Sequence, residues 1–212
     1  MATGKLSKSA VEALFATRIY RAKLPRDAQT LNEALEATCR AIAAEDRAGR
    51  RWCKEHDYRG YTSYASLDDL PTRASVFAEL IAHLDGHVRA FARSLEFDID
   101  VRELVLDSFW INVLKPGGAH SAHIHPHSVI SGTYYVSVPD GASAIRYEDP
   151  RLAMMMAAPP RRATARRENR SFVSVAPSAG TLLLWESWLR HEVLVNKARK
   201  ERISLSFNYA LR

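Results

Sequence analysis

SFWINVLKPGGAHSAHIHPHSVISGTYYVSVPD, residues 108–140, shows the pattern that governs the second half of the chain. Runs rich in β-branched and aromatic residues alternate with turn sequences such as Pro116-Gly117-Gly118 and Pro139-Asp140-Gly141. Such runs are typical of strands, and the Pro and Gly residues mark where each one ends. The pattern predicts strands near 102–114, 121–125, 129–138, 143–148, 171–176, 181–186, 191–195 and 202–210. This many short strands favour a double-stranded β-helix, the jelly-roll fold that cupins share, whose mouth can hold a metal ion and a small ligand.

Two helical patterns precede these strands. The spacing of Leu31, Leu35, Cys39 and Ile42 predicts one helix that runs to about Trp52, with Asp27 or Thr30 as its N-cap. A longer apolar stripe predicts a second helix, and we expect both helices to cover one side of a sheet. The stripe consists of Phe77, Leu80, Ile81, Leu84, Val88, Phe91 and Leu95. The fold class is therefore mostly β with N-terminal helices.

The length and composition favour a single globular domain. The chain has 212 residues, of which 47% are hydrophobic and 25% charged, which excludes a disordered tail, a fibre or a disulfide mini-protein. We expect one domain over 1–212, with residues 1–100 as a helical support region and 101–212 as the double-stranded β-helix core.

The charge and the cysteines suggest a cytoplasmic protein. The net charge of +6 is modest, and slightly favours anionic ligands. Cys39 and Cys53 have no CxxC spacing, so neither a disulfide framework nor a structural zinc site is expected. The N-terminal segment lacks the apolar core of a signal peptide, and no apolar run is long enough to span a membrane. A homodimer is the default expectation for such a chain.

Residues 150–170, PRLAMMMAAPPRRATARRENR, interrupt the strand pattern with three consecutive Met, a Pro pair and six Arg. The segment is too long for a hairpin turn, and long loops are often functional. It is either a solvated basic loop or a lid over a site, with Met154–Met156 as its adaptable apolar part. A nucleic-acid partner is not expected, because no aromatic residues are interleaved with the arginines.

Four histidines, His120, His123, His125 and His127, fall within eight residues. Alternate residues of a strand share a face, so His123 and His125 point the same way unless Pro126 bends the chain. Two such imidazoles can bind one metal ion, and neutral imidazole suits Fe, Zn, Cu or Ni. The alternative is a coincidental polar cluster.

A later strand, RISLSFNYAL, places polar residues on one face, beginning with Arg202, Ser204 and Ser206. If that face points into the barrel, the Arg202 guanidinium lies in an apolar cavity, where it needs an anion. A carboxylate fits its fork in a bidentate manner. His191, on the strand before, would by itself be read as a structural histidine.

Taken together, these motifs resemble the 2-oxoglutarate- and Fe(II)-dependent oxygenases. The stretches SFWINVLKPGGAHSAHIHPHSVISGTYYVSVPDG, IRYEDPR, and GTLLLWESWLRHEVLVN followed by ERISLSFN are similar to a bacterial and phage family of these enzymes whose substrate is undefined. The resemblance covers residues 102–210 and, more loosely, LFATRIYRAKL and GYTSYASLDDL. It implies a double-stranded β-helix enzyme of the hydroxylase type, with Fe(II) and 2-oxoglutarate as cofactors and a small-molecule or peptide substrate.

The resemblance also implies a ligand set. His123 and His191 correspond to the family's two histidine ligands. The usual carboxylate ligand stands two residues after the first histidine, and this chain has His125 there. The site therefore uses three histidines, or two with water, or recruits Glu186 or Asp149. An all-histidine site also suits Zn or Cu.

The cosubstrate residues follow from the same resemblance. Arg202 corresponds to the partner of the distal carboxylate of 2-oxoglutarate, with help from Ser204. Asn112, Tyr134 and Tyr135 lie on strands that flank the histidines and are expected to line the pocket, or, for either Tyr, to pack in the core.

Two other functions compete with this one. A cupin-type metal protein that does not use 2-oxoglutarate partly fits Gly117 and the histidine pair. However, Val129 and Ile130 stand where a cupin would have Glu, and Arg202 would have no role. A non-catalytic module that binds 2-oxoglutarate or a metal is the other alternative. It would bind its ligand without producing succinate.

Overall fold

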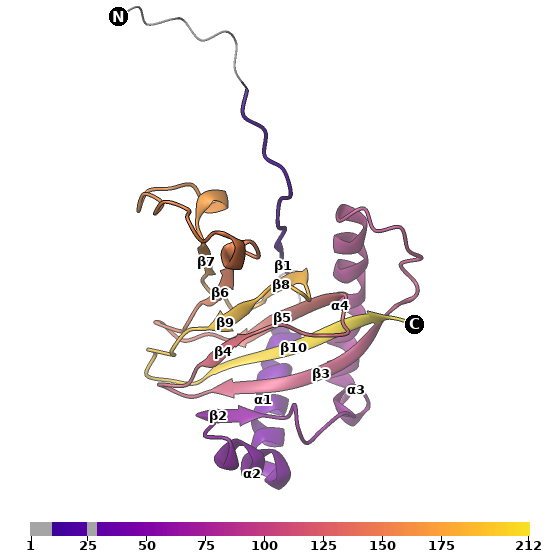
Figure 1. The fold of residues 1–212 in the computed structure, drawn as a ribbon. Coiled ribbons are helices and arrows are strands. Elements are labelled where there is room, and N and C mark those ends of the chain that lie inside the picture. Colours follow the sequence, from indigo (N-terminus) through magenta and orange to yellow (C-terminus); the bar gives the residue numbers. More distant parts are fainter. Residues whose placement is uncertain (1–9, 25–28) are drawn as a thin grey trace, which may run out of the picture.

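A computed structural model of the chain describes residues 10–24 and 29–212 (Figure 1). Two antiparallel sheets form the body, one of six strands in the order β1-β8-β5-β10-β3-β2 and one of four in the order β4-β9-β6-β7. This arrangement confirms the predicted double-stranded β-helix. The strands are β1 (Tyr20–Lys23), β2 (Gly60–Thr62), β3 (Leu104–Leu114), β4 (His120–His123), β5 (Ile130–Ser137), β6 (Ile145–Glu148), β7 (Phe172–Val175), β8 (Thr181–Glu186), β9 (His191–Val193) and β10 (Arg202–Leu211).

The helices cover one face of the six-stranded sheet (Figure 1), as the sequence predicts. They are α1 (Gln29–Glu45), α2 (Arg47–Glu55), α3 (Leu70–Arg73) and α4 (Ser75–Ser94). In the described part of the chain, no helix is both long enough and apolar enough to cross a membrane.

The prediction of one helix from Leu31 to about Trp52 was wrong, because Asp46 divides it. The Asp46 carboxylate accepts a hydrogen bond from the Gly49 N–H at 2.9 Å and so caps a new helix, α2. Tyr61 and Ser66 also donate to this carboxylate. Thr30 lies inside α1 and is not its N-cap, and Asp27 lies outside the described residues.

Two short strands, β1 and β2, were not predicted. They come before the region in which strands were expected, and their sequences are YRAK and GYT. Both are too short to stand out in the sequence: β1 alternates half-buried and exposed residues over only four positions, and β2 has three residues. β1 pairs with β8 and β2 with β3, so both lie at edges of the six-stranded sheet.

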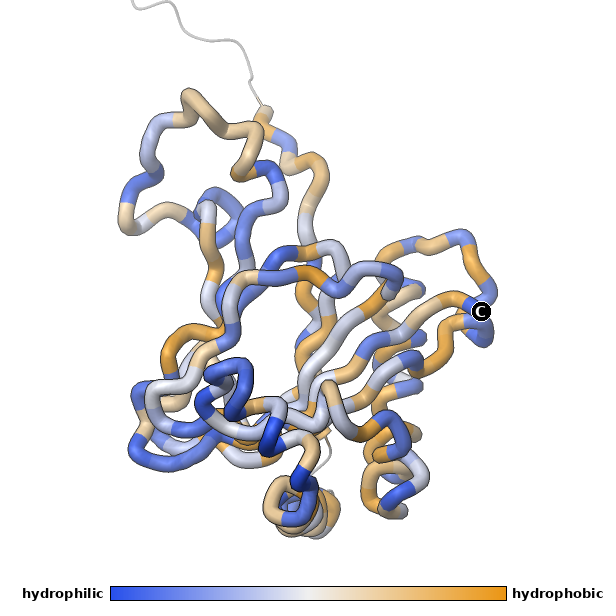
Figure 2. Tube along the Cα trace, turned by 60° about the horizontal axis from the view of Figure 1, so that its bottom comes forward, coloured by the Kyte–Doolittle hydropathy of each residue, from blue (hydrophilic) through white to orange (hydrophobic). Residues whose placement is uncertain are grey.

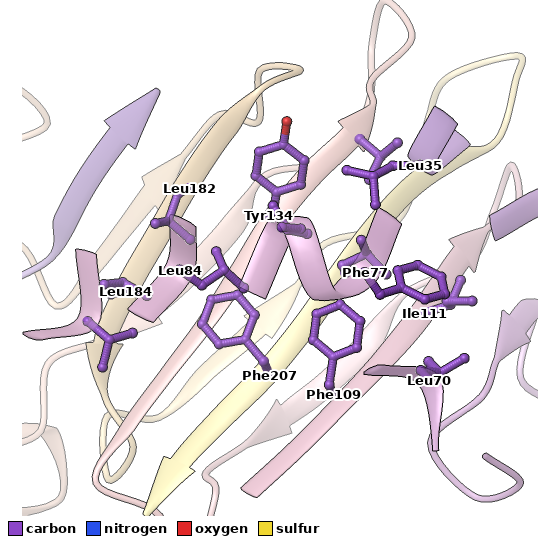
Figure 3. Packing of buried hydrophobic residues seen from close by; sticks show 14 of the residues in the cluster. Leu35, Leu70, Phe77, Leu84, Phe109, Ile111, Tyr134, Leu182, Leu184 and Phe207 are labelled. Carbon is purple, nitrogen blue, oxygen red and sulfur yellow. The ribbon is translucent and has the colours of Figure 1, made fainter. Parts of the chain in front are cut away.

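The larger core lies between this sheet and the helices (Figure 3). Phe77 of α4 packs edge-on against Phe109 of β3, with ring centroids 5.6 Å apart. Phe207, from the central strand β10, is fully buried in the same layer. Tyr134 also points to this side, where its hydroxyl donates to Asn32 Oδ1 at 2.9 Å. Tyr134 is therefore a core residue and does not line the pocket.

A smaller core lies between the two sheets. Tyr135, one residue after Tyr134, points into it and packs with side chains of β6, β7 and β8. Because successive side chains of a strand alternate, β5 supplies the helix side with Tyr134 and the inter-sheet side with Tyr135. The inter-sheet space is therefore where polar residues of the central strands can meet.

The Met- and Arg-rich segment 150–170 connects β6 to β7 and stands away from both sheets (Figures 1 and 2). It contains only two single 3-10 turns, Leu152–Met154 and Arg167–Asn169. Met154 and Met156 are 75% and 95% exposed. No residue of the segment lines either of the two hollows that contain His123 and His125. The segment therefore does not form a lid over these histidines.

Phe207→Ala should lower the free energy of unfolding by about 3–5 kcal/mol, because it leaves a cavity beneath the helices. Urea unfolding followed by circular dichroism measures this loss. The matched control is Phe172→Ala, since Phe172 is 42% exposed; it should cost about 1 kcal/mol or less. Equal losses in both variants would contradict this account of the core.

Candidate functional site

His123, His125 and His191 converge between the sheets. One ring nitrogen of each lies within 4.8 Å of the others. The strand register explains two of the three positions, because β4 pairs with β9 and His123 lies directly opposite His191. The His125 and His191 Nε2 atoms are 3.4 Å apart.

His125 reaches this cluster by a different route from the one predicted. The expected strand 121–125 ends at His123, and the backbone N–H of His125 donates to the Ser187 carbonyl at 3.0 Å. His127 then takes a positive φ of 69°, so the chain turns immediately after Pro126. The bend keeps the His125 ring beside the other two, with centroid distances of 5.1 Å to His123 and 5.2 Å to His191.

Backbone carbonyls fix the tautomers of two rings. His191 Nδ1 lies 2.8 Å from the Leu189 carbonyl, and His123 Nδ1 lies 2.7 Å from the Ser121 carbonyl. A carbonyl only accepts, so each Nδ1 carries the proton and each Nε2 keeps a lone pair. Metal-binding histidines are typically oriented by such bonds. The arrangement is therefore suited to a cation between the rings.

Burial keeps the His191 and His125 rings uncharged. It lowers the pKa of His191 to about 3 and that of His125 to about 4, and the His123 ring nearby acts in the same direction. Neutral imidazole is the form that binds metal ions. The two carboxylates considered as alternative ligands are engaged elsewhere: Glu186 accepts from the Trp188 indole at 3.1 Å, and Asp149 pairs with Arg151 at 2.9 Å.

Arg202 is a buried cation without an acidic partner. Its side chain is 2% exposed, and its Nη1 donates to the Ser143 carbonyl at 3.1 Å. Its Nε has no hydrogen-bond partner, and no ion pair to it occurs among the described residues. Burial lowers the pKa of Arg202 from its ordinary value. A guanidinium in this position can bind an anion through its unpaired edge.

One cavity joins Arg202 to the three histidines. Strand register gathers the other predicted residues there, since Ser204 of β10 lies opposite Asn112 of β3 and Tyr135 of β5. The Arg202 guanidinium lies 5.5 Å from the centre of the Tyr135 ring. The Asn112 Oδ1 atom is buried and has no hydrogen-bond partner in the described part of the chain. The remaining lining residues are Trp110, His120, Gly132, Thr133, Ile145, Trp185, Val193 and Ser206.

The pair formed by Tyr58 and His120 was not predicted from the sequence. The Tyr58 hydroxyl and His120 Nε2 are 2.7 Å apart. Burial, and then the charge of Arg202, lowers the pKa of His120 to about 3, whereas burial raises that of Tyr58. Tyr58 therefore donates and His120 accepts. Tyr58 precedes the unpredicted strand β2, so no strand pattern pointed to it.

An open groove of about 590 Å³ leads to the histidines. It shares Trp110, Asn112, His120, His123 and His125 with the cavity, but not His191. It adds aromatic walls that include Tyr64, which packs edge-on against Trp110 at 5.1 Å. Its charged lining residues outside the histidines are Asp57 and Asp107, with no Lys or Arg among the lining residues described.

Residues 108–208 match a family model described as "Putative 2OG-Fe(II) oxygenase". A prolyl-4-hydroxylase of Pseudomonas putida is 20% identical over 94% of this chain and 95% of its own, with a TM-score of 0.60. A viral collagen prolyl hydroxylase from Paramecium Bursaria Chlorella virus-1, solved with 2OG, is 13% identical over 91% and 96%, with a TM-score of 0.57.

A third solved structure is the epimerase SnoN with Fe3+, alpha ketoglutarate and nogalamycin RO. It is 13% identical over 92% of this chain and 79% of its own, with a TM-score of 0.61. At these identities the structural likeness shows the fold. No protein with a curated description matches the chain.

The buried histidines predict a pH-dependent stability of the metal-free protein. Their folded-state pKa values lie below the unfolded value of about 6.5. At any pH between the folded-state and unfolded-state pKa values, the unfolded state therefore binds more protons than the folded state. This stabilisation is complete above pH 6.5 and is lost as the pH falls towards 3. The loss reaches about 1.4 kcal/mol per pH unit for each histidine. His120→Asn should flatten the decline between pH 6.5 and 4.5, as measured by urea unfolding; an unchanged slope would contradict the burial of His120.

Proposed function

We propose, from the premise that residues 108–208 belong to the 2OG-Fe(II) oxygenase family, that His123, His125 and His191 hold the iron and that Arg202 anchors 2-oxoglutarate. The match confirms the resemblance seen in the sequence, and the protein is a 2-oxoglutarate-dependent oxygenase with Fe(II) and 2-oxoglutarate as its cofactors. The observation that carries the residue assignment is the meeting of three imidazoles and an unpaired buried guanidinium in one cavity.

The donor set fits Fe(II). Three imidazoles with available ring nitrogens suit iron, and both carboxylates that could have replaced one of them are held by other residues. An all-histidine set leaves the site one charge more positive than two histidines and a carboxylate. It therefore favours an anionic cosubstrate such as 2-oxoglutarate.

Arg202, Tyr135 and Ser204 would hold the cosubstrate. The unpaired edge of the guanidinium would bind the distal carboxylate, and the Ser204 hydroxyl would donate to it. The Tyr135 ring lies beside the guanidinium and would support it. Asn112 adds a buried amide whose oxygen is free. When bound, the two cofactors supply an O2-dependent oxidation of a substrate C–H bond, coupled to the loss of CO2 from 2-oxoglutarate.

The substrate is a small molecule or peptide that enters by the open groove and is hydroxylated. The groove carries two carboxylates, Asp57 and Asp107, and its described lining includes no Lys or Arg. These features favour a neutral or cationic group over the anionic ligand that the net charge suggested. The arginine-rich segment 150–170 does not line the groove, so it gives no support to an anionic substrate.

The helices of the first half share their core with the sheet, which supports one domain over 1–212. The cytoplasmic location and the homodimer are predictions from the sequence alone. The cupin alternative would leave the buried Arg202 without a counter-anion.

His123→Ala and His191→Ala should each weaken Fe(II) binding by about tenfold or more, because each removes one of three ligands. Anaerobic calorimetry with Fe(II) or Mn(II) measures this. His127→Ala is the matched control, since His127 belongs to the same segment but not to the cluster. His125→Asp should retain the metal, whereas His125→Ala should lose affinity. Wild-type affinity in His125→Ala would exclude the three-histidine site.

Arg202→Ala should weaken 2-oxoglutarate binding by about 2–3 kcal/mol, the range of a charge-assisted hydrogen bond. Arg202→Lys should recover only part of it, because a bidentate fork is lost. Calorimetry on the Mn(II)-loaded protein measures both, and Mn(II) affinity serves as the control for folding. Unchanged 2-oxoglutarate affinity with intact Mn(II) binding would refute the anchor.

A further inference from the structure

A second cavity shares a wall with the site. Tyr58, whose hydroxyl donates to His120, also lines a cavity of about 540 Å³ formed by α1, α2, β2 and the end of β3. This volume lies within the range of small-molecule sites, about 300–1,000 Å³. Neither the histidine cluster nor Arg202 lines it. It is therefore a separate place where a ligand can bind.

The charged residues of this cavity are almost all basic. Five cations line it, Arg40, Arg50, Lys54, Arg59 and Lys115, against one acid, Glu201. Arg40 is paired with Glu36 at 2.7 Å and with Glu201 at 3.1 Å. The other four cations form no ion pair with any residue that the structure describes. The open groove on the other side of Tyr58 carries the opposite charge.

The fold brings these four cations together as two like-charged pairs. Arg50 and Lys54 are four residues apart on α2, a spacing at which like charges repel. Arg59 and Lys115 are neighbours across the β2–β3 pairing, where the Lys115 N–H donates to the Arg59 carbonyl at 3.2 Å. A bound anion would relieve the repulsion in both pairs.

Gly60 allows the second pair to approach. A Cβ atom at this position would lie 2.2 Å from the Val113 carbonyl oxygen, so no other residue lets β2 pack this closely on β3. The apolar part of the wall includes Ala43, Ala44 and Val113. The cavity thus combines a concentrated positive charge with a surface that can contact carbon atoms.

We propose that this cavity binds a small organic molecule with several negative charges, of the class of the nucleoside diphosphates and other phosphorylated metabolites. The four unpaired cations hold the phosphate groups, and the wall of Ala43, Ala44 and Val113 contacts the organic part. The inference does not depend on the metal site, because the two share no residue that has been given a metal or cosubstrate role.

The test is a calorimetric titration of ADP into the full chain loaded with Mn(II) and saturated with 2-oxoglutarate, so that the Arg202 pocket is filled. We expect saturable binding with one site per chain, and weaker binding of AMP. The double variant Arg50→Gln, Lys54→Gln should weaken ADP binding by about tenfold or more. The matched control, Arg161→Gln with Arg162→Gln, removes the same charge from the 150–170 segment and should change the affinity by no more than about twofold.

Three results would overturn the proposal. One is the absence of saturable ADP binding at low salt, where exposed charges are least screened. Another is an equal loss in the cavity variant and the control, which would mean that only the net charge attracts ADP. The third is a single-stranded oligonucleotide that binds more tightly than ADP and is weakened by both variants alike, which would indicate a nucleic-acid surface. Circular dichroism of both variants confirms that they remain folded.

Discussion

Successive side chains of β10 point alternately at the helices and at the space between the sheets, and both halves of the structure depend on this register. Ile203, Leu205 and Phe207 enter the core beneath α4, while Arg202 and Ser204 enter the cavity with the histidines. A slip of one residue would place the guanidinium among leucines and the phenylalanine in the polar cavity. Pairing with β3 on one side and β5 on the other holds the register against such a slip.

The register of β10 also buries Arg202 in the cavity that holds the histidines, and burial determines which of these side chains are charged. Burial makes the charged forms of histidine and arginine costly, but the two residue types respond differently. His125 and His191 respond by remaining neutral, which gives these rings free lone pairs. Arg202 has too high a pKa to lose its proton and stays charged without an acid beside it. The cavity is therefore suited to bind a cation between the imidazole rings and an anion at the guanidinium.

Much of this arrangement could be predicted from the sequence, because it follows from strand alternation. The period-two spacing of His123 with His125, and of Arg202 with Ser204, predicted which side chains lie together. The structure brings these residues into one cavity. The break at Asp46 depends on hydrogen bonds from Tyr61 and Ser66, which are distant in sequence and leave no periodic signal. The Tyr58–His120 pair likewise depends on β2, a strand of three residues that is stable only through its pairing with β3.

The segment between β6 and β7 has a consequence for how this fold can vary. Its two ends are clamped by the antiparallel pairing of Tyr147 with Val173 and of Glu148 with Phe172, and its residues contribute to neither of the cavities that meet at the histidines. The entropy of closing a loop grows only slowly with its length. The chain can therefore be lengthened, shortened or interrupted by a foreign sequence at this point without disturbing the geometry of the histidines. Among the surfaces of this protein, it is a natural place for evolutionary insertion or for an attached reporter.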